Sequence, residues 1–188
     1  RRFPETTLFP GNSAALSTAL SHWSDAAFFQ PGAGLSMGTN AGLPEDVLAD
    51  RRAFFNFLDF DSLESQLPHL YAQFRAHLDL VESMLADSGP FILGQQPGWV
   101  DILAYFPLWM ARGNIPDTGA LVKKLDSLRS WEQRMQAIGH GRSSSMSAED
   151  ALAVARHNPV ETVPAVADDA WPQLSPATEV SVTPEDYG

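Results

Sequence analysis

The sequence predicts an all-α protein, a bundle of helices followed by a largely irregular acidic tail. Through most of the first 157 positions, apolar residues recur every three or four places, and signals for helix ends separate these stretches. Only Glu179-Val-Ser-Val-Thr183 alternates as a strand does. The 188 residues, 44% of them hydrophobic, are enough for one domain with a sizeable core.

The first two helices are expected at residues 13–29 and at 45 to about 57. A Gly11-Asn-Ser13 start signal precedes the first helix, and Pro31-Gly32 should end it. Residues 30–42 hold four glycines and no apolar period, which predicts a loop. The glycine spacing differs from that of a nucleotide-binding loop, and no strand precedes it.

The longest helix is expected to begin near Leu63 and to end at Ser88-Gly-Pro90. Its apolar residues recur at intervals of three or four: Leu63, Leu67, Leu70, Phe74, Leu78, Val81 and Leu85. Such a row fits a coiled coil or the core of a bundle. Its short length within a compact chain favours the bundle.

A central helix is predicted to start after Gly94-Gln-Gln-Pro-Gly-Trp-Val-Asp101 and to run from about Trp99 to Arg112. Gly98 can occupy the N-cap, and the side chain of Asp101 can accept a hydrogen bond from the Gly98 N–H. Pro107 should kink this helix. Because its residues leave no polar face, we expect it to lie in the middle of the domain.

The remaining helices are expected at about 118–125, at 126–138, and from a second capping signal, Ser147-Ala-Glu-Asp150, to about His157. Residues 158–188 contain five prolines and several acidic residues. This composition predicts a proline-rich acidic tail, or the start of a further segment. A single strand there would need a partner, because an isolated strand leaves its backbone groups unpaired.

Charge and composition exclude several classes of function. The chain has 23 acidic and 12 basic residues, a net charge of −11, and phosphate contacts need Lys and Arg. We therefore expect no nucleic-acid partner. No apolar run is long enough for a membrane span, and Arg1-Arg2 is followed by Pro4 and Glu5 without the apolar core of a signal peptide, so we expect a cytoplasmic protein with no membrane partner. There is no cysteine, and the five histidines lack metal-site spacing, so no metal is expected.

Several of these motifs resemble the C-terminal, all-helical domain of glutathione transferases. The Gly98/Asp101 pair is similar to that family's N-capping box, although the family usually has Ser or Thr at the position of Gly98. Phe91-Ile-Leu-Gly94 resembles the segment ahead of the box. Leu128-Arg-Ser-Trp-Glu-Gln-Arg134 resembles the Leu-x-x-Trp-x-x-Arg pattern of the last bundle helix. The resemblance implies a helical domain over residues 13–157, with residues 1–12 as the remnant of an interdomain linker.

The same resemblance implies a function. The family pairs this domain with an N-terminal thioredoxin-like domain, which binds glutathione and carries the activating Ser, Cys or Tyr; no part of the chain resembles that domain. The chain is therefore expected to be the hydrophobic-substrate-binding half of a glutathione transferase-like enzyme, inactive alone. Glutathione would be the co-substrate, a small hydrophobic electrophile the substrate, and a homodimer the intact assembly. The alternative is a non-catalytic binding or scaffold module.

Candidate site residues follow from the helices that line the family's hydrophobic pocket, the first and the central ones. The proposed substrate-binding residues are His22, Trp23, Phe28, Phe29, Tyr105 and Trp109. Gly98 and Asp101 are expected to be structural N-capping residues, and we expect no catalytic residue in this chain. The surface that would meet the thioredoxin-like domain should be exposed and apolar around Trp23, Phe28 and Phe29.

Overall fold

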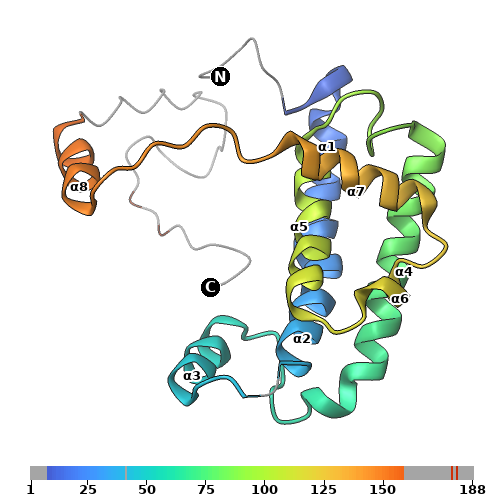
Figure 1. Ribbon diagram of the computed structural model, residues 1–188, viewed down its shortest axis with the longest axis horizontal. Helices are drawn as coiled ribbons and strands as arrows, with labels where there is room; N and C mark the ends of the chain where they lie inside the picture. Colours follow the sequence, from blue (N-terminus) through green and yellow to red (C-terminus); the bar gives the residue numbers. More distant parts are fainter. Residues whose placement is uncertain (1–7, 41, 159–178, 180, 182–188) are drawn as a thin grey trace. The chain divides into compact units, whose positions relative to one another are not determined.

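The computed structural model describes residues 8–40, 42–158, 179 and 181, and its regular elements are helices (Figure 1). This confirms the predicted all-α class. The candidate strand at 179–183 lies largely outside the described residues. The chain divides into two units, one reaching Gly139 and one beginning at His140. Among the described residues, no helix is both long enough and apolar enough to cross a membrane.

The first helical stretch continues well past its predicted end. It consists of α1 (Ala14–His22), the π-helical turn η2 (Trp23–Phe28) and α2 (Phe29–Gly38). The prediction of a loop at 30–42 is therefore wrong for most of that segment. Pro31 does not stop the helix, because it lies in the first turn of α2, just after the register change of the π turn, where a missing N–H costs little.

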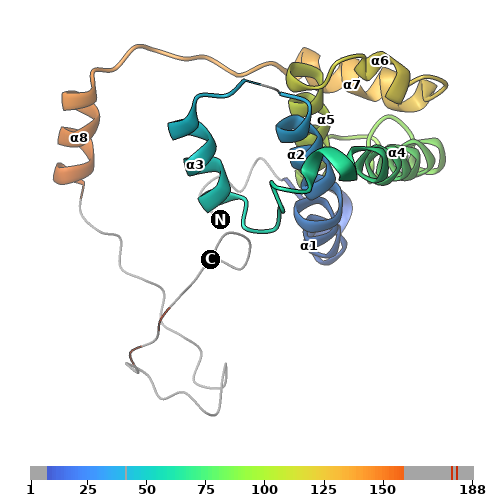
Figure 2. The same ribbon diagram turned by 90° about the horizontal axis from the view of Figure 1, so that it is seen from below.

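The glycines of α2 serve close helix packing. A Cβ atom at Gly32 would lie 3.0 Å from Cε2 of Phe74, and one at Gly34 would lie 3.0 Å from Cδ1 of Leu70. Both Phe74 and Leu70 belong to α4 (Leu63–Ser88), which flanks α2 in Figure 2. The glycines thus let α2 and α4 approach to a distance that larger residues would prevent.

Helix α4 forms the spine of the core. Six of the seven residues in its predicted apolar row are buried, and Leu67 packs against the same cluster. The bundle interpretation of this row is therefore correct. Before α4 comes α3 (Glu45–Phe54), which has no buried residue. The chain just after α3 supplies the buried Phe55, which packs with Phe29 and Ala33.

The second half of the bundle contains α5 (Trp99–Asn114), α6 (Thr118–Leu121) and α7 (Asp126–Ile138). Helix α5 contacts α1, α2 and α7, while α7 crosses α4 and α5 (Figure 1). The carboxylate of Glu82 in α4 caps α7, since it accepts hydrogen bonds from the N–H groups of Ser127 at 3.1 Å and Leu128 at 2.6 Å.

The unit that begins at His140 contains α8 (Ala148–His157). Its N-cap is Ser147, whose Oγ accepts a hydrogen bond from the N–H of Asp150 at 3.0 Å. The second capping signal of the sequence therefore does start a helix.

Candidate functional site

Asp101, at the third position of α5, is fully buried and accepts three hydrogen bonds. Its Oδ2 accepts from the N–H of Gly98 at 2.9 Å, which is the bond expected from the sequence. Its Oδ1 accepts from the N–H of Ile92 at 2.9 Å and from the indole Nε1–H of Trp131 at 2.8 Å. Gly98 has no side chain to accept in return, so only one half of a capping box forms. Both carboxylate oxygens are occupied within the core.

Helix α7 holds the segment ahead of α5 at a second point. The Nε and Nη2 atoms of Arg134 donate to the carbonyl of Pro90 at 3.0 and 2.8 Å. The same guanidinium lies over the ring of Phe91, 5.8 Å from its centroid. Trp131 and Arg134, the Trp and Arg of the Leu-x-x-Trp-x-x-Arg pattern, therefore both hold the start of α5 in place.

One face of α5 carries large apolar side chains that are exposed. Ile102, Phe106 and Trp109 have exposed fractions of 43%, 47% and 55%. They stand four and three residues apart, so they share one side of the helix, which we call the outer face of α5. The expectation that the whole helix lies inside the domain is wrong for this face. The expectation is correct for the opposite side of the helix, where Ala104, Leu108 and Ala111 are buried.

Three aromatic rings form a row that leads onto the outer face. The ring of Phe29 stacks on that of Phe106 with centroids 5.7 Å apart and 13° between the planes. Phe106 in turn stacks on Trp109 at 6.1 Å and 20°. Phe29 is buried at one end of the row, while Trp109 is exposed at the other. A planar apolar molecule could extend such a row by stacking on the exposed rings.

The candidate residues on the first helical stretch divide between two places. Trp23 and Phe28 stack at 5.5 Å on the α4 side, and the Nε1–H of Trp23 donates to Nδ1 of His77 at 3.2 Å. Burial lowers the pKa of His77. Phe29 lies in the ring row, and His22 is exposed. Since Phe28 and Phe29 are both buried, the expected exposed surface around them is absent, and the outer face of α5 is the exposed aromatic surface instead.

The two candidates on α5 point in different directions. Trp109 belongs to the outer face, whereas Tyr105 turns toward α7 and meets the ring of Trp131 edge-on at 5.9 Å. Burial is the main cause that raises the pKa of Tyr105, and a hydrogen bond with Gln136 opposes this shift. The six candidates therefore do not line one common pocket. Among the described residues, no three metal-ligand side chains gather at one point.

Sequence reasoning missed Ile102 and Phe106 as site residues. Their spacing with Trp109 is a helical signal, but the residues on the other sides of α5 are apolar too. A helix that is apolar all round does not reveal which side its neighbours leave open. Only the positions of α1, α2 and α7 identify the outer face.

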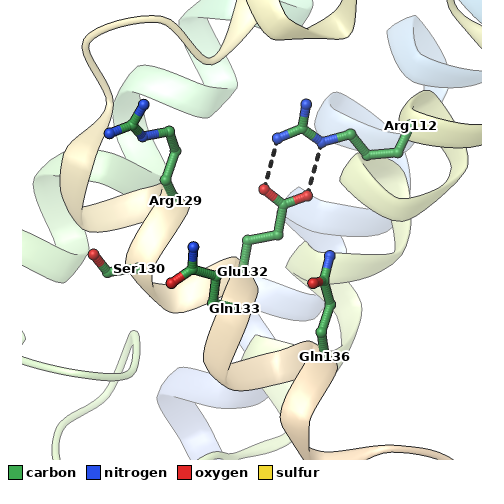
Figure 3. Close-up of a pocket in the computed structure, with 6 residues that line it drawn as sticks. All are labelled: Arg112, Arg129, Ser130, Glu132, Gln133 and Gln136. Carbon is green, nitrogen blue, oxygen red and sulfur yellow. Dashed lines mark hydrogen bonds and ion pairs between the residues drawn. The ribbon is translucent and has the colours of Figure 1, made fainter.

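A pocket of about 620 Å³ lies between the C-terminal half of α5 and α7 (Figure 3). Its lining is polar and consists of Arg112, Arg129, Ser130, Glu132, Gln133 and Gln136. Arg112 and Glu132 form a bidentate ion pair, with Nε–Oε1 at 2.8 Å and Nη2–Oε2 at 2.7 Å. This pair joins α5 to α7 at the far end from Asp101.

Residues 64–134 match the family model of the glutathione S-transferase, C-terminal domain. The matched range takes in α4 from its second residue, all of α5 and α6, and α7 as far as Arg134. It includes Asp101, Trp131 and Arg134, the residues that hold the start of α5. No curated protein matches the chain. Over residues 64–134 the chain is therefore similar to the glutathione S-transferase C-terminal domain, and the helical bundle and the hydrogen bonds of Asp101 fit that similarity.

Proposed function

We propose that this domain is the hydrophobic-substrate-binding half of a glutathione transferase-like enzyme and that the substrate lies on the outer face of α5. The observation that carries the proposal is the row of stacked rings that ends in the exposed Phe106 and Trp109. Large apolar side chains that gather on a surface mark a binding site. A planar aromatic electrophile could stack on these rings, with Ile102 extending the contact along the helix.

The proposed reaction is conjugation, in which the thiolate sulfur of glutathione attacks a carbon of the electrophile and displaces its leaving group. Ile102, Phe106 and Trp109 have no ionisable group, so this face contributes binding and orientation. Activation of the thiolate belongs, in the proposal, to a thioredoxin-like domain, and the intact assembly is a homodimer.

Because the proposal assigns activation of the thiolate to a thioredoxin-like domain, the 188-residue chain alone should not conjugate glutathione to an electrophile. The assay follows the absorbance of a chromogenic aryl halide with glutathione present. The expected rate equals that of the mixture without protein. A rate that increases in proportion to the protein concentration would contradict the proposal.

Binding at the outer face can be measured separately from chemistry. Equilibrium dialysis gives the Kd of the same aryl halide for the chain and for Phe106→Ala, which removes the middle ring of the row. We expect at least about a fivefold weaker Kd, since stacked aromatic pairs contribute about 0.5 to 1.5 kcal/mol each. The matched control is Ile138→Ala, which changes an apolar residue at the end of α7 that is 55% exposed, against 47% for Phe106. An equal loss in both variants would show that binding is not confined to α5.

A non-catalytic module that holds a partner is the second candidate. The same exposed face supports it, because an exposed apolar stripe can also bind the surface of another protein. The coding sequence upstream of Arg1 separates the two. A thioredoxin-like stretch with a Ser, Cys or Tyr near its first strand supports the enzyme, and a different upstream sequence supports the module.

A further inference from the structure

The polar pocket between α5 and α7 differs in chemistry from the outer face of α5. No apolar side chain is part of its lining, whereas five of the six lining residues carry N–H or O–H donors: Arg112, Arg129, Ser130, Gln133 and Gln136 (Figure 3). Its volume of about 620 Å³ falls in the range of small-molecule sites.

The one acid in the lining is fully engaged. Both oxygens of Glu132 accept from Arg112, and the Glu132 side chain is only 8% exposed. Figure 3 shows the two groups face to face, with Gln136 below them. The negative charge of the carboxylate is therefore balanced by the guanidinium of Arg112.

The guanidinium of Arg129 uses only part of its hydrogen-bonding capacity in its pair with Asp126. Its Nη2 atom donates to Oδ1 of Asp126 at 3.0 Å, and this pair is solvent-exposed. Within the described part of the chain, the Nε and Nη1 atoms of Arg129 have no hydrogen-bond acceptor. Exposed ion pairs of this kind contribute little to stability, so Arg129 can bind another anion at a small cost in free energy.

The charges of the lining residues add up to +1, because two arginines oppose one glutamate. The whole chain has a net charge of −11, so a lining with excess positive charge and many donors is a local exception. Outside its pair with Glu132, the Nη1 group of Arg112 makes one hydrogen bond of 3.4 Å to Oγ1 of Thr118. We propose that this pocket binds a small oxyanion, a carboxylate or a phosphate, held by Arg129 and by the Nη1 side of Arg112, with the carboxamides of Gln133 and Gln136 at its sides.

The test uses the 188-residue chain and two probes, succinate and inorganic phosphate, each titrated at constant ionic strength maintained with chloride. Chemical shifts of the arginine Nε–H and glutamine side-chain amide groups are followed by NMR. The expected result is a saturable shift at Arg112, Arg129, Gln133 and Gln136. The tighter of the two probes identifies the kind of oxyanion.

Arg129→Gln should weaken the Kd of the tighter probe at least fivefold, because it removes the charge and keeps a polar side chain. Arg51→Gln is the matched control, since the side chain of Arg51 is 42% exposed and also pairs with an exposed acid, Asp50. It should leave the Kd unchanged. Gln133→Ala, a second exposed change, should weaken binding if Arg129→Gln disturbs the fold. Shifts that grow linearly without saturation, or an unchanged Kd in Arg129→Gln and Gln133→Ala, would overturn the proposal.

Discussion

The indole nitrogen of Trp131 donates a 2.8 Å hydrogen bond to Oδ1 of Asp101, and both side chains are fully buried. The bond joins α7 to the first turn of α5 across thirty positions of sequence. Charge-assisted hydrogen bonds are stronger than neutral ones, and a buried donor without a partner is costly. Asp101 therefore organises the fold from the inner side of the helix whose outer side is exposed.

The first prediction concerns the energy of this contact. Asp101→Ala leaves three buried donors without their acceptor and should lower the free energy of unfolding by about 3 kcal/mol, more than the 0.5 to 2 kcal/mol of a surface cap. Urea denaturation of Asp101→Ala, Trp131→Phe and the double variant measures the coupling. The double variant should lose clearly less than the sum of the two single losses. Additive losses of unfolding free energy would show that the hydrogen bond between Trp131 and Asp101 contributes nothing to stability.

The second prediction concerns the glycines at the α2–α4 contact. Gly32→Ala should destabilise by about 1 to 3 kcal/mol, because its Cβ would lie 3.0 Å from the buried ring of Phe74. Gly113→Ala is the control within α5, where nothing lies within 4 Å of the new Cβ. It should stabilise by up to about 1 kcal/mol through helix propensity. Melting temperatures that shift in the same direction for both variants would refute the packing role.

Helix α2 also shows where sequence reasoning fails. The row in α4 was predictable, because its apolar residues face one core over the whole helix. Glycine and proline at 31–38 indicate a turn by local chemistry alone, yet Gly32 and Gly34 are small because α4 packs against them. A local signal does not reveal a tertiary neighbour, so the loop prediction was wrong.

The third prediction concerns the incomplete cap. From the sequence alone, Gly98→Ser should add a side-chain acceptor and raise stability. The structure reverses this expectation, because a Cβ at Gly98 would lie 3.1 Å from the carbonyl oxygen of Leu8 and 3.1 Å from Cδ of Pro10. That oxygen accepts the N–H of Trp99 at 2.7 Å, so moving it weakens a backbone bond. We expect a lower melting temperature for Gly98→Ser. A higher melting temperature would show that residues 8–10 move aside readily when the side chain is added.

The fourth prediction is a pH dependence that comes from His77. Burial lowers the pKa of this imidazole from the 6.5 of an exposed histidine, and its Nδ1 must be unprotonated to accept from Trp23. The unfolded chain thus takes up the proton at higher pH than the folded chain. The contribution of His77 is complete above about pH 6.5 and is lost as the pH falls toward the folded pKa.

Urea denaturation at pH 7.5 and 5.5 tests this sign. The difference in unfolding free energy between the two pH values should shrink in His77→Gln and remain in His22→Gln, where the histidine is exposed. If both variants keep the full difference, another group is responsible for the acid sensitivity.

Only part of the candidate site could be predicted from the sequence. Trp109 was named and is exposed on α5, and Asp101 makes the bond to Gly98 that its spacing suggests. Phe28 was named with the same reasoning, but it is fully buried against Phe74 and His77. Aromatic residues on a helix are equally suited to a core and to a pocket, and only the neighbouring helices decide between the two.

In the proposed function, helix α5 has two separate roles: Asp101 on its inner side stabilises the fold, and Trp109 on its outer side binds the substrate. The most direct test measures the melting temperature and the aryl halide Kd of Asp101→Ala and Trp109→Ala at a temperature where both are folded. Asp101→Ala should melt earlier and keep its Kd within about twofold, whereas Trp109→Ala should keep its melting temperature and weaken the Kd about tenfold, or about 1.4 kcal/mol. An Asp101→Ala variant that melts normally but no longer binds would contradict the claim.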